Sequence, residues 1–408
     1  MLKSLTVQHY KSLAEIRVDF TPVTILVGPN GSGKSNIVDV LRFVRDAVVY
    51  GLDHALSERG GLDIVRQYSP TRPYSISIKL EFETDDGISG NQFPASYTLK
   101  IAGSGSNYRV ESEDASWSQT VFVVDDEEDE AENDRDSGSV FSEVHSIESF
   151  TLHRDRHGKV FVNDQERKRP VAPDQLAIKT FGPPTEFFEH HGTISRQLSG
   201  LRFASMYPNI LREPSRPDTD RQLKENCANW ASILKAMRQR KLGEQMIHRI
   251  TELMRQVMPG LETVSVKLVG GYLVPQFLIK DNPDSKAHYF DPVQLSDGTL
   301  RLFAIFLTLY QTPHPVFLAL EEPELTIHPG LISLLAEATR EVSERTQLLI
   351  TTHSPYVLDH FAPEEIKVVS MREGETRVSG IRRSQVETVK KGLMTLSEVM
   401  VLDGLRPE

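Results

Sequence analysis

Residues 28–35 read Gly28-Pro29-Asn30-Gly31-Ser32-Gly33-Lys34-Ser35, and they match the pattern G-x-x-x-x-G-K-[ST]. The apolar run at residues 23–27 comes directly before this stretch and predicts a strand that is buried on both faces. Apolar residues at helical spacing, from position 37 to position 48, follow the stretch and predict a helix. A glycine-rich turn that leaves a buried strand and opens a helix is typical of a loop that binds phosphate groups.

The residue types in this loop suit the binding of ATP with Mg²⁺. Glycines allow successive backbone N–H groups to curl around phosphates without a clash at Cβ. The N-terminus of the helix adds the positive end of its dipole. We expect the ammonium group of Lys34 to reach the β- and γ-phosphates and the hydroxyl group of Ser35 to bind Mg²⁺. The residues expected to hold the nucleotide are Gly28, Pro29, Asn30, Gly31, Ser32, Gly33, Lys34, Ser35 and Asn36.

A pair of acidic residues follows a second apolar run, at residues 316–320. This run continues into Glu321-Glu322-Pro323-Glu324. Two carboxylates at the end of a buried strand carry a desolvation cost that a metal ion can offset. In a phosphate-loop ATPase, the Mg²⁺ ligand and the general base belong at this place. We therefore assign Glu321 to the metal, and Glu322 as the general base that polarises the attacking water.

Two further motifs lie on either side of the acidic pair along the chain. Leu295-Ser296-Asp297-Gly298-Thr299 opens a helix that we expect at about residues 296–310. Ser296 and Gly298 would present a hydroxyl group and backbone N–H groups there, which would make a second anion site. An ordinary helix N-cap is the plainer interpretation of the same residues. His353 follows a strand expected at residues 348–351, where a lone histidine is more often structural.

These motifs resemble the ABC-type ATPases of the SMC/RecF/OLD group, especially the stand-alone bacterial predicted ATPases of the "AAA family". The opening Val7-Gln8-His9-Tyr10-Lys11-Ser12 resembles the "nFKS" strand of the group, and residues 27–36 are almost its consensus phosphate loop. Glu321-Glu322-Pro323-Glu324, with Ile327-His328-Pro329 after it, resembles the "DEPE…LHP" segment of the group. Glu321 stands where Asp is commoner, so its contact with the metal is either direct or through a water.

The resemblance implies an α/β fold, namely an ABC ATPase head (a P-loop NTPase) that is split by a β-rich and a helical insertion. It implies that two copies join head to tail on ATP and hydrolyse it to ADP and phosphate. Residues 295–299 are similar to the ABC signature, so Ser296 and Gly298 would bind the γ-phosphate held by the other subunit. His353 matches the switch histidine, which would contact the γ-phosphate and the attacking water. The catalytic residues are then Lys34, Glu322 and His353.

The period of the apolar residues changes along the chain and suggests four parts. Alternation with a period of two runs from about residue 75 to residue 165 and predicts antiparallel strands. A helical apolar stripe follows, and strands then alternate with helices, which predicts a mostly parallel sheet. The expected parts are the first half of the head at 1–74, a β-rich lobe with the acidic loop 125–136 at 75–184, a helical insertion at 185–260, and the second half of the head at 261–408.

Composition limits the classes of protein and partner. The 408 residues are 39% hydrophobic and 25% charged, with one cysteine and no apolar run long enough for a membrane span, so we expect a cytoplasmic protein with no membrane partner. The formal net charge of −11 means that contact with DNA would need a local basic patch. The basic residues of one helical segment are candidates, although a solvated face is the plainer interpretation: Arg238, Arg240, Lys241, Arg249 and Arg255.

Three functional interpretations follow from these motifs. The leading one is an SMC/RecF-like ATPase in DNA maintenance or anti-phage defence, working with a separately encoded nuclease or toxin and with DNA as a further candidate partner. A regulatory scaffold that binds ATP with little turnover is the second. The ATPase subunit of a transporter is the third, and the long separation between the phosphate loop and the signature disfavours it. Gln67, about 30 residues after Lys34, is a candidate for the Q-loop glutamine of the family.

Overall fold

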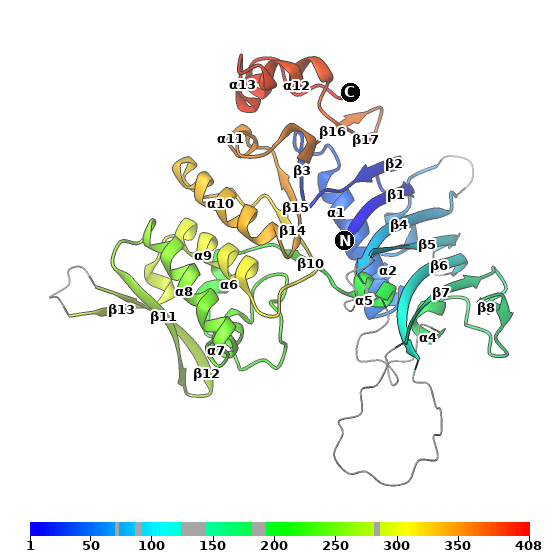
Figure 1. The fold of residues 1–408 in the computed structure, drawn as a ribbon, viewed down its shortest axis with the longest axis horizontal. Helices are drawn as coiled ribbons and strands as arrows, with labels where there is room; N and C mark the ends of the chain where they lie inside the picture. The colour runs from blue at the N-terminus through cyan, green and yellow to red at the C-terminus, as the bar shows by residue number, and fades with distance from the viewer. Residues whose placement is uncertain (70–72, 86–91, 106, 124–143, 182–192, 281–285) are drawn as a thin grey trace, which may run out of the picture. The chain divides into compact units, whose positions relative to one another are not determined.

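The computed structural model describes residues 1–69, 73–85, 92–105, 107–123, 144–181, 193–280 and 286–408 (Figure 1). The acidic loop 125–136 lies outside these residues. Contacts divide the chain into two compact units, Met1–His9 with Asp46–Ser199 (the β unit) and Tyr10–Arg45 with Gly200–Glu408 (the P-loop unit). The four-part division expected from the sequence has other boundaries and stays a prediction. None of the helices in the described ranges has the length and apolarity that crossing a bilayer requires.

The P-loop unit is built on a six-stranded sheet in the order β10-β14-β15-β3-β16-β17. The first five strands run parallel and the last pair is antiparallel. Their bounds are β10 Leu201–Ala204, β14 Phe317–Glu321, β15 Gln347–Thr352, β3 Val23–Val27, β16 Ile366–Arg372 and β17 Glu375–Ser379. Every residue of β3 and of β15 is buried, as expected for central strands of a parallel sheet that is covered on both faces. The mixed α/β fold and the mostly parallel sheet predicted from the sequence are therefore present.

The register of the central strands brings their carboxyl ends together. Glu321 at the end of β14 lies opposite Thr351 of β15, and Thr352 lies opposite Val27 at the end of β3. Because these strands are parallel, the turns that follow them leave the same edge of the sheet. The acidic pair, His353 and the phosphate loop are those turns.

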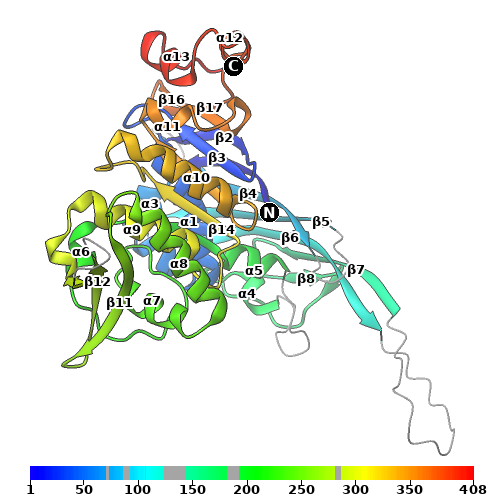
Figure 2. The same ribbon diagram turned by 60° about the vertical axis from the view of Figure 1, so that its left-hand side comes forward.

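Helices of the P-loop unit bury the faces of this sheet. Helix α1 (Lys34–Val49) follows the phosphate loop, and α9 (Asp297–Tyr310) and α10 (Ile332–Ser343) match the helices expected near 296–310 and 331–345. Helix α7 packs on α8, α8 on α9 and α9 on α10, and Figure 2 shows this layer. The other strands and α-helices of this unit are β2 (Leu13–Asp19), α6 (Pro208–Arg212), α7 (Trp230–Arg238), α8 (Lys241–Arg255), β11 (Leu261–Val269), β12 (Tyr272–Ile279), β13 (His288–Phe290), α11 (Pro355–Leu358), α12 (Arg383–Lys390) and α13 (Leu396–Leu402).

The β unit is an antiparallel sheet in the order β1-β4-β5-β6-β7-β8-β9. Its strands are β1 (Leu2–Tyr10), β4 (Ile76–Asp85), β5 (Gln92–Ser104), β6 (Asn107–Val123), β7 (Val144–Arg154), β8 (Val160–Val162) and β9 (Gln165–Glu166). Its helices are α2 (Leu52–Ser57), α3 (Leu62–Val65), α4 (Ala177–Phe181) and α5 (Thr193–Ser199). Ile76, Ile78 and Leu80 of β4 are fully buried while their neighbours are more exposed, so the alternation in the sequence marks the core face of this sheet.

A buried carboxylate joins the sheet of the β unit to the start of α4. Glu113 on β6 is fully buried and accepts hydrogen bonds from the Tyr97 hydroxyl group at 3.0 Å, from the Ile178 N–H at 3.1 Å and from the Ala177 N–H. Burial raises the pKa of Glu113, and these hydrogen bonds and the guanidinium of Arg154 oppose that rise. The carboxylate therefore satisfies donors that would otherwise be buried without an acceptor.

We predict that Glu113→Gln lowers the free energy of unfolding by about 2–4 kcal/mol, because one carboxamide oxygen cannot serve three donors and a buried N–H group would face another. Chemical denaturation monitored by circular dichroism measures the change. Glu111→Gln, on the same strand but partly exposed, is the matched control and should change the stability by less than about 0.5 kcal/mol. Equal effects of the two substitutions would contradict this role of Glu113.

Candidate nucleotide-binding site

The phosphate loop borders an open cavity of about 380 Å³ at the carboxyl edge of the parallel sheet. The residues that line it are Asn30, Gly31, Ser32, Gly33, Lys34, Ser35, Asn36 and Glu322. Seven of the nine expected nucleotide-binding residues and the expected general base thus surround one space. Gly28 and Pro29 contribute to the loop from the strand side and do not line the cavity.

The glycines of the loop are required by its backbone and by close packing. Gly33 has φ 102°, and a Cβ atom there would lie 2.0 Å from Oγ1 of Thr376. At Gly28, a Cβ atom would lie 2.1 Å from the carbonyl oxygen of Val369. Both distances are shorter than any real contact, so side chains at these positions would displace the loop.

Polar groups in the loop suit the phosphates of a nucleotide. Lys34 is almost fully buried, and its ammonium group donates to the carbonyl oxygens of Gly28 at 2.7 Å and Pro29 at 3.1 Å. Burial lowers the pKa of Lys34, while the charges of Glu322 and Glu324 act in the opposite direction. The hydroxyl group of Ser32 is buried and has no hydrogen-bond partner among the described residues. A phosphate group in the cavity would supply the acceptor that Ser32 lacks.

Glu322 is held at the end of β14 in an unusual backbone conformation. Its φ is 44°, in the left-handed region that a residue with a side chain rarely adopts, and its N–H donates to the carbonyl oxygen of Thr351 at 3.0 Å. Such backbone strain is found often at functional sites. Nδ1 of His353 lies 3.3 Å from Oε1 of Glu322, so two of the three residues assigned to catalysis contact each other. Both side chains are partly exposed.

Glu321 and Glu324 point into different environments on either side of this contact. Glu321 pairs with Arg42 of α1 at 2.9 Å and does not line the cavity. Glu324 is buried and accepts a hydrogen bond from the hydroxyl group of Thr352. Burial raises the pKa of Glu324, and the bond from Thr352 opposes that rise. The candidate metal ligand is therefore anchored by a cation, while Glu324 is fixed within the turn.

The signature residues lie outside the cavity lining. Oγ of Ser296 accepts a hydrogen bond from the N–H of Thr299 at 3.2 Å and caps α9, so the plainer interpretation as an N-cap describes its contact in one chain. Gly298 packs against the turn that follows the acidic pair, because a Cβ atom there would lie 2.6 Å from the carbonyl oxygen of Thr326. An anion-binding role for Ser296 and Gly298 stays a prediction, and it would require a ligand that comes from elsewhere.

Three arginines take part in this arrangement and were not predicted. Arg301 of α9 donates to the main-chain carbonyl of Glu322 at 2.9 Å, and so connects the signature helix to the candidate base. Arg212 of α6 donates to the carbonyl oxygen of Leu295 at 2.9 Å and pairs with Asp297. The third is Arg42 of α1, which pairs with Glu321. Gln67, the candidate Q-loop glutamine, contacts His9 within the β unit and is absent from the cavity lining.

Comparisons with curated proteins identify SMC proteins as relatives of part of the chain. The chromosome partition protein Smc of Bacillus subtilis (strain 168) is 41% identical over 111 residues, which are 26% of this chain and 9% of that protein. The Smc protein of Halothermothrix orenii is 56% identical over 45 residues, which are 10% of this chain and 4% of that protein. This chain therefore matches less than a tenth of the length of these relatives.

Solved structures share the fold over nearly the whole chain. The Smc head domain with an extended coiled coil, bound to the C-terminal domain of ScpA and derived from Pyrococcus furiosus, has a TM-score of 0.51 and 12% identity, covering 96% of this chain and 99% of that chain. The Smc head domain with a coiled coil and joint from Pyrococcus yayanosii has a TM-score of 0.50, 12% identity and the same coverage of both chains. The predicted ABC-type head fold is thus confirmed.

A family described as "AAA domain, putative AbiEii toxin, Type IV TA system" matches residues 23–359, which include the phosphate loop, the signature, the acidic pair and His353. This span is more than half of the chain. The chain therefore belongs to this AAA-domain family, and its fold is that of an SMC-type ABC ATPase head.

Proposed function

We propose that this chain binds ATP with Mg²⁺ and hydrolyses it to ADP and phosphate in a site that two copies complete. The cavity lined jointly by the phosphate loop and Glu322 is the observation that carries the proposal. The buried hydroxyl group of Ser32, which lacks a partner in the described part of the chain, supports a phosphate ligand. The ammonium group of Lys34 would exchange the carbonyl oxygens of Gly28 and Pro29 for β- and γ-phosphate oxygens.

The donor set near the loop suits Mg²⁺, which prefers oxygen ligands and keeps several waters. Ser35 would hold the ion through its hydroxyl group, and Glu321 would hold it directly or through a water. The bound ion would neutralise negative charge on the phosphates. Glu322 would accept the proton of the attacking water, and His353 would orient that water and contact the γ-phosphate. The contact between Glu322 and His353 supports this pairing of roles.

The position of the signature supports a dimer. Ser296 and Gly298 do not line the cavity of their own chain, although the start of a long helix with these residues suits an anion. In a head-to-tail dimer with twofold symmetry, each signature would meet the phosphate loop of the other copy. ATP would then join two copies and hydrolysis would release them, which makes the γ-phosphate a switch.

The biological setting follows from the resemblance. We place the chain in DNA maintenance or anti-phage defence with a separately encoded nuclease or toxin as effector. The toxin named in the family description suits a defence setting. Direct DNA binding by the basic helical segment has less support, because Arg238, Arg249 and Arg255 already donate to carboxylates or carbonyl oxygens of the chain itself.

We predict that Lys34→Ala weakens the binding of ATP by roughly a hundredfold, about 3 kcal/mol, because charge-assisted hydrogen bonds to the phosphates are lost. Titration with a fluorescent ATP analogue measures the affinity. Lys224→Ala is the matched control. The ammonium group of Lys224 lies 2.6 Å from Oδ2 of Asp218, and Lys224 does not line the cavity. Binding by Lys34→Ala at the wild-type affinity would rule out the proposed role of the loop.

We predict that Glu322→Gln reduces ATP turnover by at least about a hundredfold and leaves ATP binding intact, because the carboxamide cannot accept a proton from water. The ATP-bound dimer should then accumulate, and sedimentation velocity with and without ATP measures it. Glu364→Gln, at an exposed ion pair with Lys390, is the control. Wild-type turnover in Glu322→Gln would refute the assignment of the base, and negligible turnover in the unsubstituted chain would favour the regulatory scaffold.

A further inference from the structure

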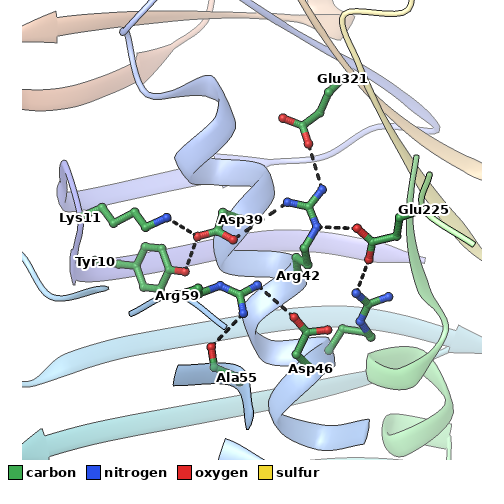
Figure 3. Close-up of polar contacts among 10 residues, drawn as sticks. Tyr10, Lys11, Asp39, Arg42, Asp46, Ala55, Arg59, Glu225 and Glu321 are labelled. Atoms are coloured by element: carbon green, nitrogen blue, oxygen red, sulfur yellow. Dashed lines mark hydrogen bonds and ion pairs between the residues drawn. The ribbon is translucent and has the colours of Figure 1, made fainter. Parts of the chain in front are cut away.

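The guanidinium group of Arg42 lies among three carboxylates on one side of α1 (Figure 3). One of its terminal nitrogens donates to Oε1 of Glu321 at 2.9 Å, and its Nε lies 3.0 Å from Oε2 of Glu225. The other terminal nitrogen lies 4.0 Å from Oδ1 of Asp39. Arg42 therefore bridges the candidate metal ligand and Glu225, a residue from the segment between α6 and α7.

Asp39 and Glu225 each have a second cationic partner. The ammonium group of Lys11 lies 2.6 Å from Oδ2 of Asp39, and Arg45 pairs with Glu225. Among the residues that the structure describes, Arg42 is the cation that contacts Glu321. Loss of Arg42 would therefore leave Asp39 and Glu225 paired but would remove the anchor of Glu321.

The pair between Arg42 and Glu321 is largely shielded from solvent, with side chains that are 21% and 22% exposed. Burial by itself lowers the pKa of Arg42, but the charges of Glu225 and Glu321 outweigh burial, and the pKa lies above its usual value. The guanidinium group also lies 4.9 Å from the ring centroid of Phe203. These contacts hold the planar guanidinium group from two sides, so its N–H donors point in defined directions.

Glu321 needs such an anchor more than a shorter residue would. Its side chain has one more rotatable bond than aspartate, so fixing it in one arrangement costs more conformational entropy. A hydrogen bond to one carboxylate oxygen selects a single arrangement and leaves the other oxygen for a metal ion or its bound water. Loss of a residue that orients a metal ligand in this way commonly lowers the affinity for the metal 10- to 100-fold.

We propose that Arg42 is a positioning residue that holds Glu321 ready for Mg²⁺, with Glu225 fixing the guanidinium group from the other side. The inference rests on the proposed function, because it takes Glu321 to be the metal ligand. It adds a residue of α1 and one of the segment before α7 to the set that controls Mg²⁺ binding.

The test compares Arg42→Met with Arg45→Met. Arg45 lies one turn further along α1, pairs with Glu225 and packs on the ring of Phe203, so its loss disturbs the same surroundings without touching Glu321. The readout is the affinity for a non-hydrolysable ATP analogue, measured by calorimetry with Mg²⁺ and with EDTA. We expect Arg42→Met to reduce the gain in affinity due to Mg²⁺ roughly tenfold, with no change in EDTA, and Arg45→Met to keep the gain.

Combination with Glu321→Asp separates positioning from general damage. The shorter carboxylate of aspartate cannot reach the guanidinium group. In the Glu321→Asp background, Arg42→Met should therefore cause no further loss of the gain in affinity due to Mg²⁺. Arg42→Lys keeps the positive charge, but the ammonium group cannot contact Glu321 and Glu225 at the same time. This variant should therefore lose the gain in affinity due to Mg²⁺, as Arg42→Met does.

Three results would overturn the inference: a full Mg²⁺ gain in Arg42→Met, a full Mg²⁺ gain in Arg42→Lys, or an equal loss from Arg42→Met in both backgrounds. Failure of the proposed function looks different, because the unsubstituted chain would then bind no nucleotide or show no gain with Mg²⁺. Unfolding midpoints of all variants identify any loss of the fold, and Arg42→Lys carries the test if Arg42→Met does not fold.

Discussion

The parallel pairing of β3, β15 and β14 is the constraint on which the candidate site depends. Two of these strands are buried along their whole length, and the third is buried up to Glu321, so a shift in register would move apolar side chains out of the core. With the register fixed, the ends of the three strands lie side by side. The phosphate loop, Glu322 and His353 are therefore brought together by the core of the sheet.

Cations from the helices then balance the carboxylates at this edge. Arg42 of α1 contacts Glu321, and Arg301 of α9 contacts the main chain of Glu322. Buried or half-buried charges are tolerated when such partners satisfy them. Because α9 begins directly after Ser296, one helix carries both the candidate signature and Arg301, which donates to the main-chain carbonyl of Glu322. The candidate signature and the main chain of Glu322 are thus linked through α9 within one chain.

Much of this arrangement could be predicted because it is local in sequence. The loop, its flanking strand and helix, and the order of the motifs follow from patterns of neighbouring residues, and they led to the α/β head fold. The N-cap at Ser296 was also predicted as one of two interpretations.

By contrast, the bond between Arg42 and Glu321 joins residues 279 positions apart, and no local pattern marks which arginine will contact which carboxylate. The close approach of Thr376 to Gly33 could not be predicted either, because it depends on how distant strands pair. The pairing of β1 with β4 joins residues that are far apart in the sequence, and residues 1–9 belong to the same unit as that later segment.

The central claim is that two copies complete each site, and mixing two inactive variants tests it most directly. Lys34→Ala keeps an intact signature, while Ser296→Arg keeps an intact phosphate loop and blocks the signature. A mixed dimer would contain one intact composite site, so equal amounts of the two should recover up to about a quarter of the wild-type ATPase rate when the copies pair at random. Recovery of activity on mixing is the result that the account predicts. Full activity of Ser296→Arg alone, or no recovery on mixing two folded variants that are each inactive, would contradict it.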